Sequence, residues 1–302
     1  MYHSFAEVEN FILSSGEKKR IALACAHDDD ALSAVVNGKR KGVAQGILIG
    51  REGEIRCLLE KMGEKAEDYT IIDSQDEQES ARIAFQMVKD SQADIPMKGL
   101  MQTATFMRAV LNKEMGFVPP KGLLSQATVV EYTSQGRLLI ISDCAVNIVP
   151  TYEEKVKIIQ NSAVLAHALG CPTPKVAVVS AVETVNPAIP STVDAAMLSA
   201  AFRRGQIKGC GAVDGPFGLD NAVDAAAAAH KKITSDVAGV AEILIMPDLC
   251  TGNVFTKSLT YFAKLPSAGT LLGTTSPVIM TSRSDTPDNK YASILMAILL
   301  AF

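Results

Sequence analysis

The sequence predicts an α/β protein with two domains, each built on a mostly parallel sheet. Its 302 residues exceed one ordinary domain, since domains average about 150 residues. Short apolar runs alternate with segments of helical periodicity, which is typical of parallel sheets whose crossovers are helices. Hydrophobic residues make up 48% of the chain and charged residues 21%, so there is enough apolar material for two cores.

The first part of the chain contains repeated strand–helix units. The run "RIALACA" (20–26) is continuously apolar, as expected of a strand buried on both faces. The next segment, "DDDALSAVVNGKRKG", has apolar residues at helical spacing and ends in possible glycine stops. Further strands are expected at 46–50, 69–73 and 93–99. This repetition predicts right-handed crossovers and helices on both faces of the first sheet.

The alternation breaks at residues 126–147, where two apolar segments leave little room for a helix between them. This pattern predicts an antiparallel hairpin, with a domain boundary near its turn. The first domain is expected to span 1–133 plus 286–302, and the second 134–285. In the second domain, strands are expected at 175–182, 209–216 and 241–247, and the last helix of the chain at about 287–301.

Charge and composition exclude several classes of partner. The chain has 29 Lys and Arg against 33 Asp and Glu, so its net charge of −4 offers no general attraction for nucleic acid or anionic lipid. Tryptophan is absent, which disfavours base-stacking platforms. No apolar run approaches the ~20 residues of a membrane span, and the N-terminus does not resemble a signal peptide, which indicates a cytoplasmic protein. The six cysteines and four histidines do not cluster, so no metal site is expected.

Polar clusters follow several predicted strands, at the edge where open α/β sheets bind ligands. In "MKGLMQTATF", Lys98 and Gly99 close a strand, and Thr103 lies in the first turn of a helix. Glycine allows close backbone approach, and free helix-start amides beside a hydroxyl can hold an anion. Ordinary helix capping explains the same residues equally well.

Two further clusters lie in the predicted second domain. Glu183 stands in the loop "SAVETVNPAIPST", which is either a functional lip or a rigid surface loop. Asp214-Gly-Pro is expected to form a tight turn at a strand end. Asp220 and Asp224 would share one helix face and suit a divalent metal, although a solvated helix face with a capping aspartate is the favoured interpretation.

The segment "MPDLCTGNVFTK" ends a strand and is expected to start a helix around Gly252 and Asn253. Backbone amides at this point, with Lys257 one turn further on, would suit a phosphate. The alternative is a helix cap followed by a surface lysine.

Near the C-terminus, "PVIMTSRSDTPDN" contains one arginine among several small hydroxyl residues. Thr286 is a natural N-cap, with Pro287 and Asp288 in the first turn of the last helix. This cap leaves residues 281–285 unexplained, and we interpret them as an anion-facing strand end.

Segments spread from about residue 20 to the C-terminus resemble the phosphate acyltransferases, which are the phosphate acetyl- and butyryltransferases. The resemblance is greatest to the butyryl-type branch. The segments that carry it include "KGLMQTATFMRAVLNKE", "PKVAVVSAVETVNPAIPST", "GCGAVDGPFGLDNAV", "MPDLCTGNVFTKSL" and "PVIMTSRSDT". The Gly-Asn-x₃-Lys and Ser-Arg-x-Asp patterns are the most specific of these.

The resemblance implies a reaction and a fold. Acyl-CoA and phosphate would give acyl phosphate and free CoA by direct attack in a ternary complex, without an organic cofactor. The fold would be two α/β domains like those of isocitrate and isopropylmalate dehydrogenases, with the active site in the interdomain cleft and the last helix returning to the first domain. Relatives act as homodimers or larger assemblies, so a homo-oligomer is implied.

The resemblance also implies roles for the residues near the C-terminus. The functional Ser-Arg pair of the family corresponds to Ser282 and Arg283. The acidic residue expected seven positions after the serine is Asn289 in this chain, so Asp285 or Asp288 is implied as the base. A carboxylate would help because a free thiol has a pKa near 8.5.

Arg283 would bind phosphate bidentately, and Ser282 with the helix-start amides near Gly252 and Asn253 would stabilise developing charge. The candidate residues for binding phosphate or CoA are Lys98, Gly99, Thr103, Glu183, Asp214, Gly252, Asn253 and Lys257. Three alternatives stay open: an acetyl-specific enzyme, a metal- and NAD-dependent decarboxylating dehydrogenase of the same fold, and a CoA-binding regulator without activity.

Overall fold

A computed structural model describes all 302 residues and divides them into two compact units. The N/C unit comprises residues 5–122 and 267–302, and the middle unit comprises residues 123–266 with residues 1–4. The predicted boundaries differ, because the hairpin near residue 133 lies wholly within the middle unit and residues 267–285 belong with the last helix. No helix has the length and apolar character needed to cross a membrane.

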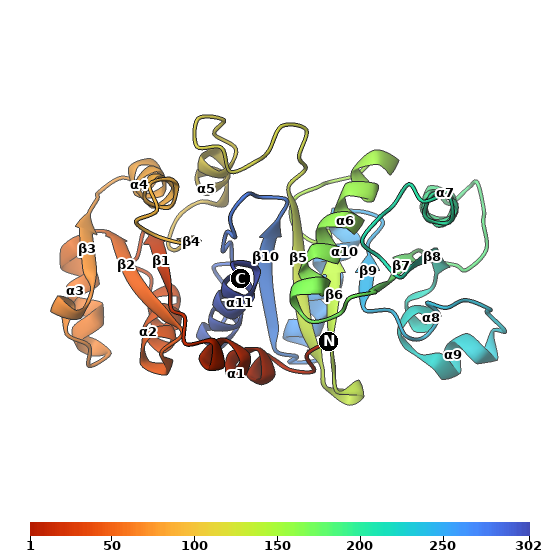
Figure 1. Cartoon of the computed structure of the whole chain (residues 1–302), viewed down its shortest axis with the longest axis horizontal. Helices are drawn as coiled ribbons and strands as arrows, with labels where there is room; N and C mark the ends of the chain where they lie inside the picture. The colour runs from red at the N-terminus through yellow and green to blue at the C-terminus, as the bar shows by residue number, and fades with distance from the viewer. The chain divides into compact units, whose positions relative to one another are not determined.

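The N/C unit contains a parallel sheet with the strand order β3-β2-β1-β4. The strand bounds are β1 Lys19–Ala24, β2 Ala44–Gly50, β3 Thr70–Asp73 and β4 Ile95–Lys98. The strand–helix alternation predicted for this part of the chain is therefore confirmed, and Figure 1 shows the unit with β3 at one side and β4 towards the other.

Helices connect these strands and enclose a large apolar core. They are α1 Phe5–Ser15, α2 Asp29–Lys41, α3 Glu52–Lys61, α4 Glu77–Lys89, α5 Thr103–Val110 and α11 Pro287–Leu300, with a short 3₁₀ turn at Ala66–Asp68. Helix α11 is apolar around most of its circumference and is buried from Asn289 to Leu299, as expected of a helix enclosed by other elements. It packs on α1, α2 and β10, and β10 spans Ser267–Leu272.

A short extended segment of the N/C unit lies beside β4. Ile279 forms a parallel bridge with Met97 and donates its N–H to the Pro96 carbonyl at 3.0 Å. Its own carbonyl accepts from the Lys98 N–H at 3.0 Å. Residues 281–286 therefore leave the sheet at the same edge as the end of β4.

The middle unit begins with the predicted hairpin, in which β5 (Ser125–Tyr132) pairs antiparallel with β6 (Arg137–Ser142). Parallel strands β9 (Ile243–Ile245), β7 (Lys175–Val179) and β8 (Ala212–Phe217) follow in the order β5-β6-β9-β7-β8. The prediction of mostly parallel sheets is therefore confirmed for both units.

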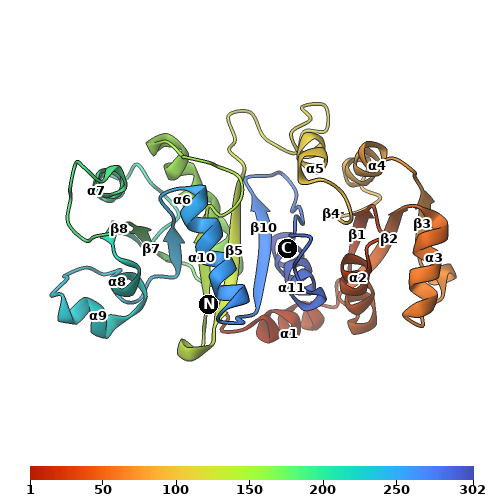
Figure 2. The ribbon, with the colours of Figure 1, turned by 180° about the vertical axis from the view of Figure 1, so that it is seen from behind.

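The helices of the middle unit cover both faces of its sheet. They are α6 Tyr152–Ala168, α7 Pro190–Arg203, α8 Leu219–Val223, α9 Ala225–His230 and α10 Leu249–Tyr261. Helix α6 lies in front of the strands in Figure 1, whereas α10 lies in front of them in the reversed view of Figure 2. Buried residues such as Ile141, Val179 and Leu244 form the core beneath them.

Two local predictions for the middle unit are wrong. Asp214-Gly-Pro does not form a turn, because β8 continues through these residues to Phe217. A proline is tolerated there since β8 is an edge strand, where a missing N–H costs no ladder hydrogen bond. Asp220 and Asp224 do not share a continuous helix, because Asp224 ends α8 and caps α9 by accepting from the Ala227 N–H at 2.8 Å.

Candidate active site

The strand order of the N/C unit places a topological switch point between β1 and β4. The chain runs outward from β1 to β2 and β3, and then returns to add β4 on the other side of β1. Open α/β sheets bind ligands at such a point, beyond the carboxyl ends of the strands. Lys98 ends β4 at this edge, and Asp28 follows β1 there as the N-cap of α2.

Lys98 is the most unusual charged residue at the switch point. Its side chain is only 2% exposed, and its ammonium makes no ion pair and reaches only the Gly99 carbonyl, at 3.4 Å. Burial lowers the pKa of Lys98, and the positive charges of Arg283 and Lys290 lower it further. A buried ammonium is unfavourable without a partner, so this position is suited to an anion.

Gly99 has a structural reason to be glycine. Its N–H donates to the Ala24 carbonyl at 2.8 Å, and a side chain would collide with the carbonyl oxygens of Ala24 and Cys25. Only glycine allows the ends of β1 and β4 to approach so closely. Thr103 is the exposed first residue of α5, whose N-cap Gln102 makes no side-chain cap.

The segment 281–286 forms a closed turn before α11. The Ser282 N–H donates to Asp285 Oδ2 at 2.8 Å, and the Asp285 N–H donates to the Ser282 carbonyl at 3.2 Å. Thr286 caps α11 by accepting from the Asn289 N–H at 3.2 Å, which confirms the predicted cap. Arg283 is exposed within this turn, and its charge acts on Lys98.

The acidic candidates near the C-terminus differ in their partners. The Asp285 carboxylate accepts from the Ser282 amide and so helps to shape the turn. Asp288 is exposed in the first turn of α11 and accepts no hydrogen bond from the chain. Asn289 is buried, and its Oδ1 accepts from the Ser267 N–H at 3.1 Å, so it joins β10 to α11. Asn289 therefore has a structural role at this position.

The structure thus brings together the first and last of the predicted polar clusters, at neighbouring strand ends of one unit. It also adds Lys290, which was not among the residues predicted from the sequence. Lys290 is only 1% exposed, and its ammonium donates to the Asp285 carbonyl at 2.9 Å. The available signal was a lysine inside an otherwise apolar helix.

The carboxylates of Asp214 and Glu183 have partners within the middle unit. Asp214 Oδ1 accepts from Ser199 Oγ at 2.7 Å, and its Oδ2 accepts from Ser235 Oγ at 2.6 Å. Both carboxylate oxygens are therefore used to tie β8 to its neighbours. Glu183 lies 3.5 Å from the ammonium of Lys231, which also pairs with Asp220.

The prediction of free amides near Gly252 and Asn253 is wrong, because α10 begins earlier. Asp248 is its N-cap, and the Gly252 N–H donates within the helix to the Asp248 carbonyl at 3.1 Å. A side chain at Gly252 would collide with the Asp143 carbonyl, which explains the glycine. Asn253 Nδ2 donates to the Cys144 carbonyl at 3.2 Å, and Lys257 is exposed with its ammonium 5.9 Å from the Tyr261 ring centre.

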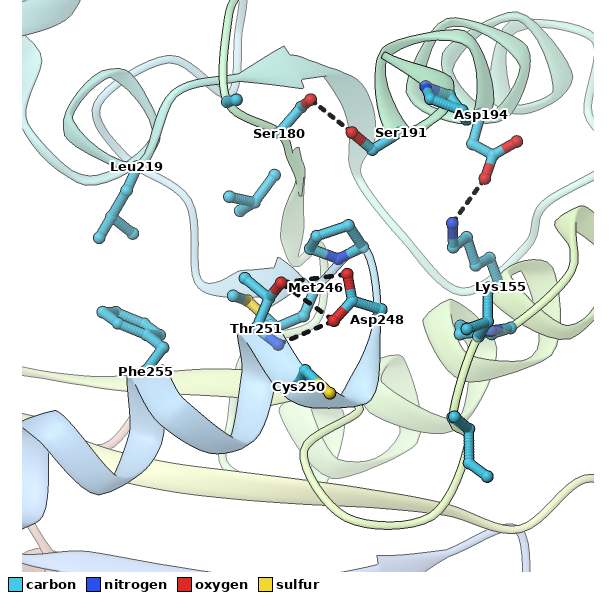
Figure 3. Close-up of a pocket in the computed structure, with 17 residues that line it drawn as sticks. Lys155, Ser180, Ser191, Asp194, Leu219, Met246, Asp248, Cys250, Thr251 and Phe255 are labelled. Carbon is cyan, nitrogen blue, oxygen red and sulfur yellow. Dashed lines mark hydrogen bonds and ion pairs between the residues drawn. The ribbon is translucent and has the colours of Figure 1, made fainter.

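A pocket of about 670 Å³ opens in the middle unit, beyond the ends of β7 and β9 (Figure 3). Its polar groups are already paired: Ser180 with Ser191 at 2.8 Å, and Lys155 with Asp194 at 2.6 Å. The apolar lining residues include Val149, Val179, Leu219, Met246 and Phe255. This arrangement suits a ligand with a substantial apolar part. The sequence indicated two of the segments that line it, the loop that starts at Ser180 and the segment "MPDLCTGNVFTK" that begins at Met246.

Comparison with known proteins agrees with an anion-binding enzyme. The family model described as "Phosphate acetyl/butaryl transferase" matches residues 58–298. The chain belongs to this family. It is therefore a phosphate acyltransferase, an enzyme whose family substrates are acyl-CoA and phosphate.

Two relatives show how similar the family members are. The phosphate butyryltransferase of Clostridium acetobutylicum is 44% identical, and the alignment covers 100% of this chain and 99% of that protein. The phosphate acetyltransferase of Thermotoga maritima is 41% identical, over 96% and 97% of the two chains. Proteins named for two different acyl groups are thus almost equally similar to this chain.

Solved structures confirm the predicted fold. A branched-chain phosphotransacylase from Enterococcus faecalis has a TM-score of 0.82 and 30% identity, with coverage of 94% of this chain and 99% of that one. A 4-hydroxythreonine-4-phosphate dehydrogenase from Klebsiella pneumoniae has a TM-score of 0.55 at 14% identity, over 94% and 100% of the chains. The second similarity concerns the fold alone and confirms its relation to dehydrogenases.

Proposed function

We propose that this phosphate acyltransferase is a phosphate butyryltransferase, which moves a butyryl or short branched acyl group reversibly between CoA and inorganic phosphate. The similarity to the Clostridium acetobutylicum phosphate butyryltransferase and to a branched-chain phosphotransacylase supports this acyl class. The observation that carries the proposal in the structure is Lys98, a buried ammonium without a carboxylate partner beside Arg283.

Phosphate binding is assigned to the end of β4 and the neighbouring turn. Lys98 supplies a buried point charge, and Arg283 supplies a planar pair of donors that matches two phosphate oxygens. Ser282 adds a hydroxyl on the same turn. The positive charges that lower the pKa of Lys98 repel one another, and a phosphate dianion would relieve this repulsion.

Asp288 is the better candidate for the base, because Asp285 already accepts from the Ser282 amide. With acyl phosphate as substrate, the Asp288 carboxylate takes the thiol proton, the CoA sulfur attacks the acyl carbon, and phosphate leaves. In the opposite direction a phosphate oxygen attacks the thioester, and the departing thiolate recovers the proton. The position of the active site in a cleft between the two domains, which the family resemblance implies, stays a prediction.

The direct test measures thiol release from butyryl-CoA with and without phosphate. We expect release to depend on phosphate, and acetyl-, isobutyryl- and isovaleryl-CoA then rank the acyl groups. Preference for acetyl-CoA would favour the alternative, a phosphate acetyltransferase, which the Thermotoga maritima relative supports. Thiol release that ignores phosphate, or is absent with every acyl-CoA, would contradict the proposed function.

Arg283→Gln tests the phosphate role of the turn. Loss of a charge-assisted contact costs about 1.5–3 kcal/mol, so kcat/KM for phosphate is expected to fall by roughly 10- to 150-fold. Retention of efficiency within about threefold would remove Arg283 from the phosphate site.

A further inference from the structure

Lys290 is a second buried lysine in the N/C unit, and the roles assigned above do not use it. It stands at the start of α11, where only 1% of its surface is exposed and the following residues are apolar and buried. Placing an ammonium in such surroundings is unfavourable unless specific partners compensate. Its partners therefore indicate why a lysine is present.

The partners of Lys290 belong mainly to the turn that carries Arg283. The ammonium donates to the Asp285 carbonyl at 2.9 Å and lies 3.5 Å from the Arg283 carbonyl. The only carboxylate within 4 Å belongs to Asp30 on α2, at 3.8 Å, and that side chain is 48% exposed. The shortest contact of Lys290 is thus with a backbone oxygen, and its contact with an opposite charge is longer and weaker.

The other hydrogen bonds of the turn do not replace this contact. Ser282 and Asp285 bond to each other and close the turn internally, and Thr286 caps α11. The direction of the Arg283 and Asp285 carbonyls is instead fixed by Lys290. Because a peptide plane sets the direction of the side chains on either side of it, this ammonium constrains where the Arg283 side chain starts.

Lys290 also contributes charge to the same region. Its ammonium is one of the groups that lower the pKa of Lys98, after burial and Arg283. The carboxylates of Asp28 and Glu77 act in the opposite direction and raise the pKa of Lys98. The charges of Arg283 and Lys290 both act on the Lys98 ammonium at the end of β4.

We propose that Lys290 is a positioning residue for phosphate: its buried ammonium holds the carbonyls of Arg283 and Asp285 and so fixes the turn that presents Arg283. In this role Lys290 does not touch the substrate. The inference rests on the proposed function of the N/C unit as the phosphate site. It predicts an effect on phosphate binding that is larger than the effect on turnover.

The test compares Lys290→Met and Lys290→Arg with the wild-type protein. Methionine has a similar volume but cannot donate, so KM for phosphate is expected to rise about tenfold while kcat stays within about threefold. Arginine keeps the charge and the donors and is expected to restore part of the phosphate affinity. The increase in Tm caused by inorganic phosphate, which needs no turnover, should be reduced in Lys290→Met and partly regained in Lys290→Arg.

The matched control is Ser293→Ala, one turn further along α11. Ser293 is buried, accepts from the Gly269 N–H at 3.0 Å and donates to the Asn289 carbonyl at 2.9 Å, so its hydrogen bonds lie outside the turn. It should lower Tm and leave KM for phosphate unchanged. If Lys290→Met does not fold, Lys290→Gln is measured in the same way.

Two results would overturn the positioning role. One is a folded Lys290→Met or Lys290→Gln protein whose KM for phosphate and phosphate-induced Tm shift equal those of the wild type. The other is an equal loss in Ser293→Ala, which would show a general effect of disturbing α11. Failure of the proposed function is distinguishable, because the wild-type protein itself would then show no phosphate-dependent thiol release.

Discussion

Both units contain half-buried or buried charged residues, yet these residues are partnered differently in the two units. In the N/C unit, Lys98 is buried without an ion pair and Asp288 accepts no hydrogen bond from the chain. In the middle unit, Asp214 accepts from two hydroxyls, and Lys155 is paired with Asp194. A charge whose partners lie inside the protein stabilises the fold, whereas a charge left without one is available for a ligand.

This difference separates residues that look alike in the sequence. Asp214 and Asp288 both stand in polar clusters near strand ends, and so do Lys98 and Lys257. Only the three-dimensional neighbours of each side chain show whether it connects two secondary-structure elements or is available to bind a ligand. The comparison can be tested by removing partnered and unpartnered charges and measuring activity and stability separately.

The largest effect on activity is expected from replacing one of the two aspartates that follow Ser282, which are Asp285 and Asp288. Asp288→Asn removes the free carboxylate and should lower kcat by roughly 10²- to 10⁴-fold, the usual contribution of a general base. Asp285→Asn keeps the size and one acceptor oxygen for the Ser282 amide, so a smaller loss is expected. Steady-state kinetics with butyryl-CoA and phosphate provides the measurement. The reverse ranking would assign the base to Asp285.

The next effect is expected for Lys98→Met, which removes the unpartnered ammonium at nearly constant volume. Loss of a buried charged contact to phosphate costs about 2–5 kcal/mol, so kcat/KM for phosphate should fall by at least about 30-fold. The free energy of unfolding should stay equal or rise, because an unfavourable buried charge disappears. Activity and urea denaturation are measured on the same protein. A less stable variant with normal kinetics would place Lys98 among the structural residues.

A smaller effect, in stability alone, is expected for Asp214→Ala in the middle unit. The substitution leaves the hydroxyls of Ser199 and Ser235 without their acceptor, which should lower the free energy of unfolding by about 1.5–3 kcal/mol. The folded protein should retain its kcat/KM. Asp220→Ala is the matched control, since its ion pair with Lys231 is exposed and should contribute less than about 0.5 kcal/mol. A tenfold loss of activity without loss of stability would restore Asp214 as a binding residue.

Local signals in the sequence predicted local structure well. The Thr286 cap and the start of α11 at Pro287 follow from two adjacent residues, and the structure has both. The predicted start of α10 near Gly252 and Asn253 is wrong, because Asp248 is the N-cap and the helix begins at Leu249. Aspartate is an ordinary capping residue, so this start could have been predicted. The expected shared helix face of Asp220 and Asp224 is wrong, whereas the capping aspartate of the favoured interpretation is present, as Asp224 at the start of α9.

The candidate site depended on information that no local pattern contains. Lys98 and the turn at 281–286 are about 180 residues apart, and they become neighbours because Ile279 pairs with the segment that ends β4. Burial of Lys290 follows from the packing of α11 against α1, α2 and β10, which its own sequence does not specify. The residue types of the site could therefore be predicted from the sequence. Which of these side chains have partners could be seen only in the folded structure.

The smallest expected effect is a pH dependence of stability that distinguishes Lys98 from partnered lysines. Burial, and then the charge of Arg283, lowers the pKa of Lys98 below its ordinary value of 10.5. Between the lowered pKa and 10.5 the unfolded chain holds a proton that the folded chain has released. The unfolded state binds more protons in this window, so the free energy of unfolding contributed by Lys98 rises with pH.

Urea denaturation of the wild-type protein and Lys98→Met across this window, without phosphate, measures the effect. Methionine has no proton to release, so its stability advantage over lysine should be greatest below the lowered pKa and should shrink as the pH rises towards 10.5. Lys257→Met, at an exposed lysine, provides the baseline to subtract. An advantage that stays constant or grows with pH would mean that Lys98 is compensated in the folded protein, and its contrast with Asp214 and Lys155 would then disappear.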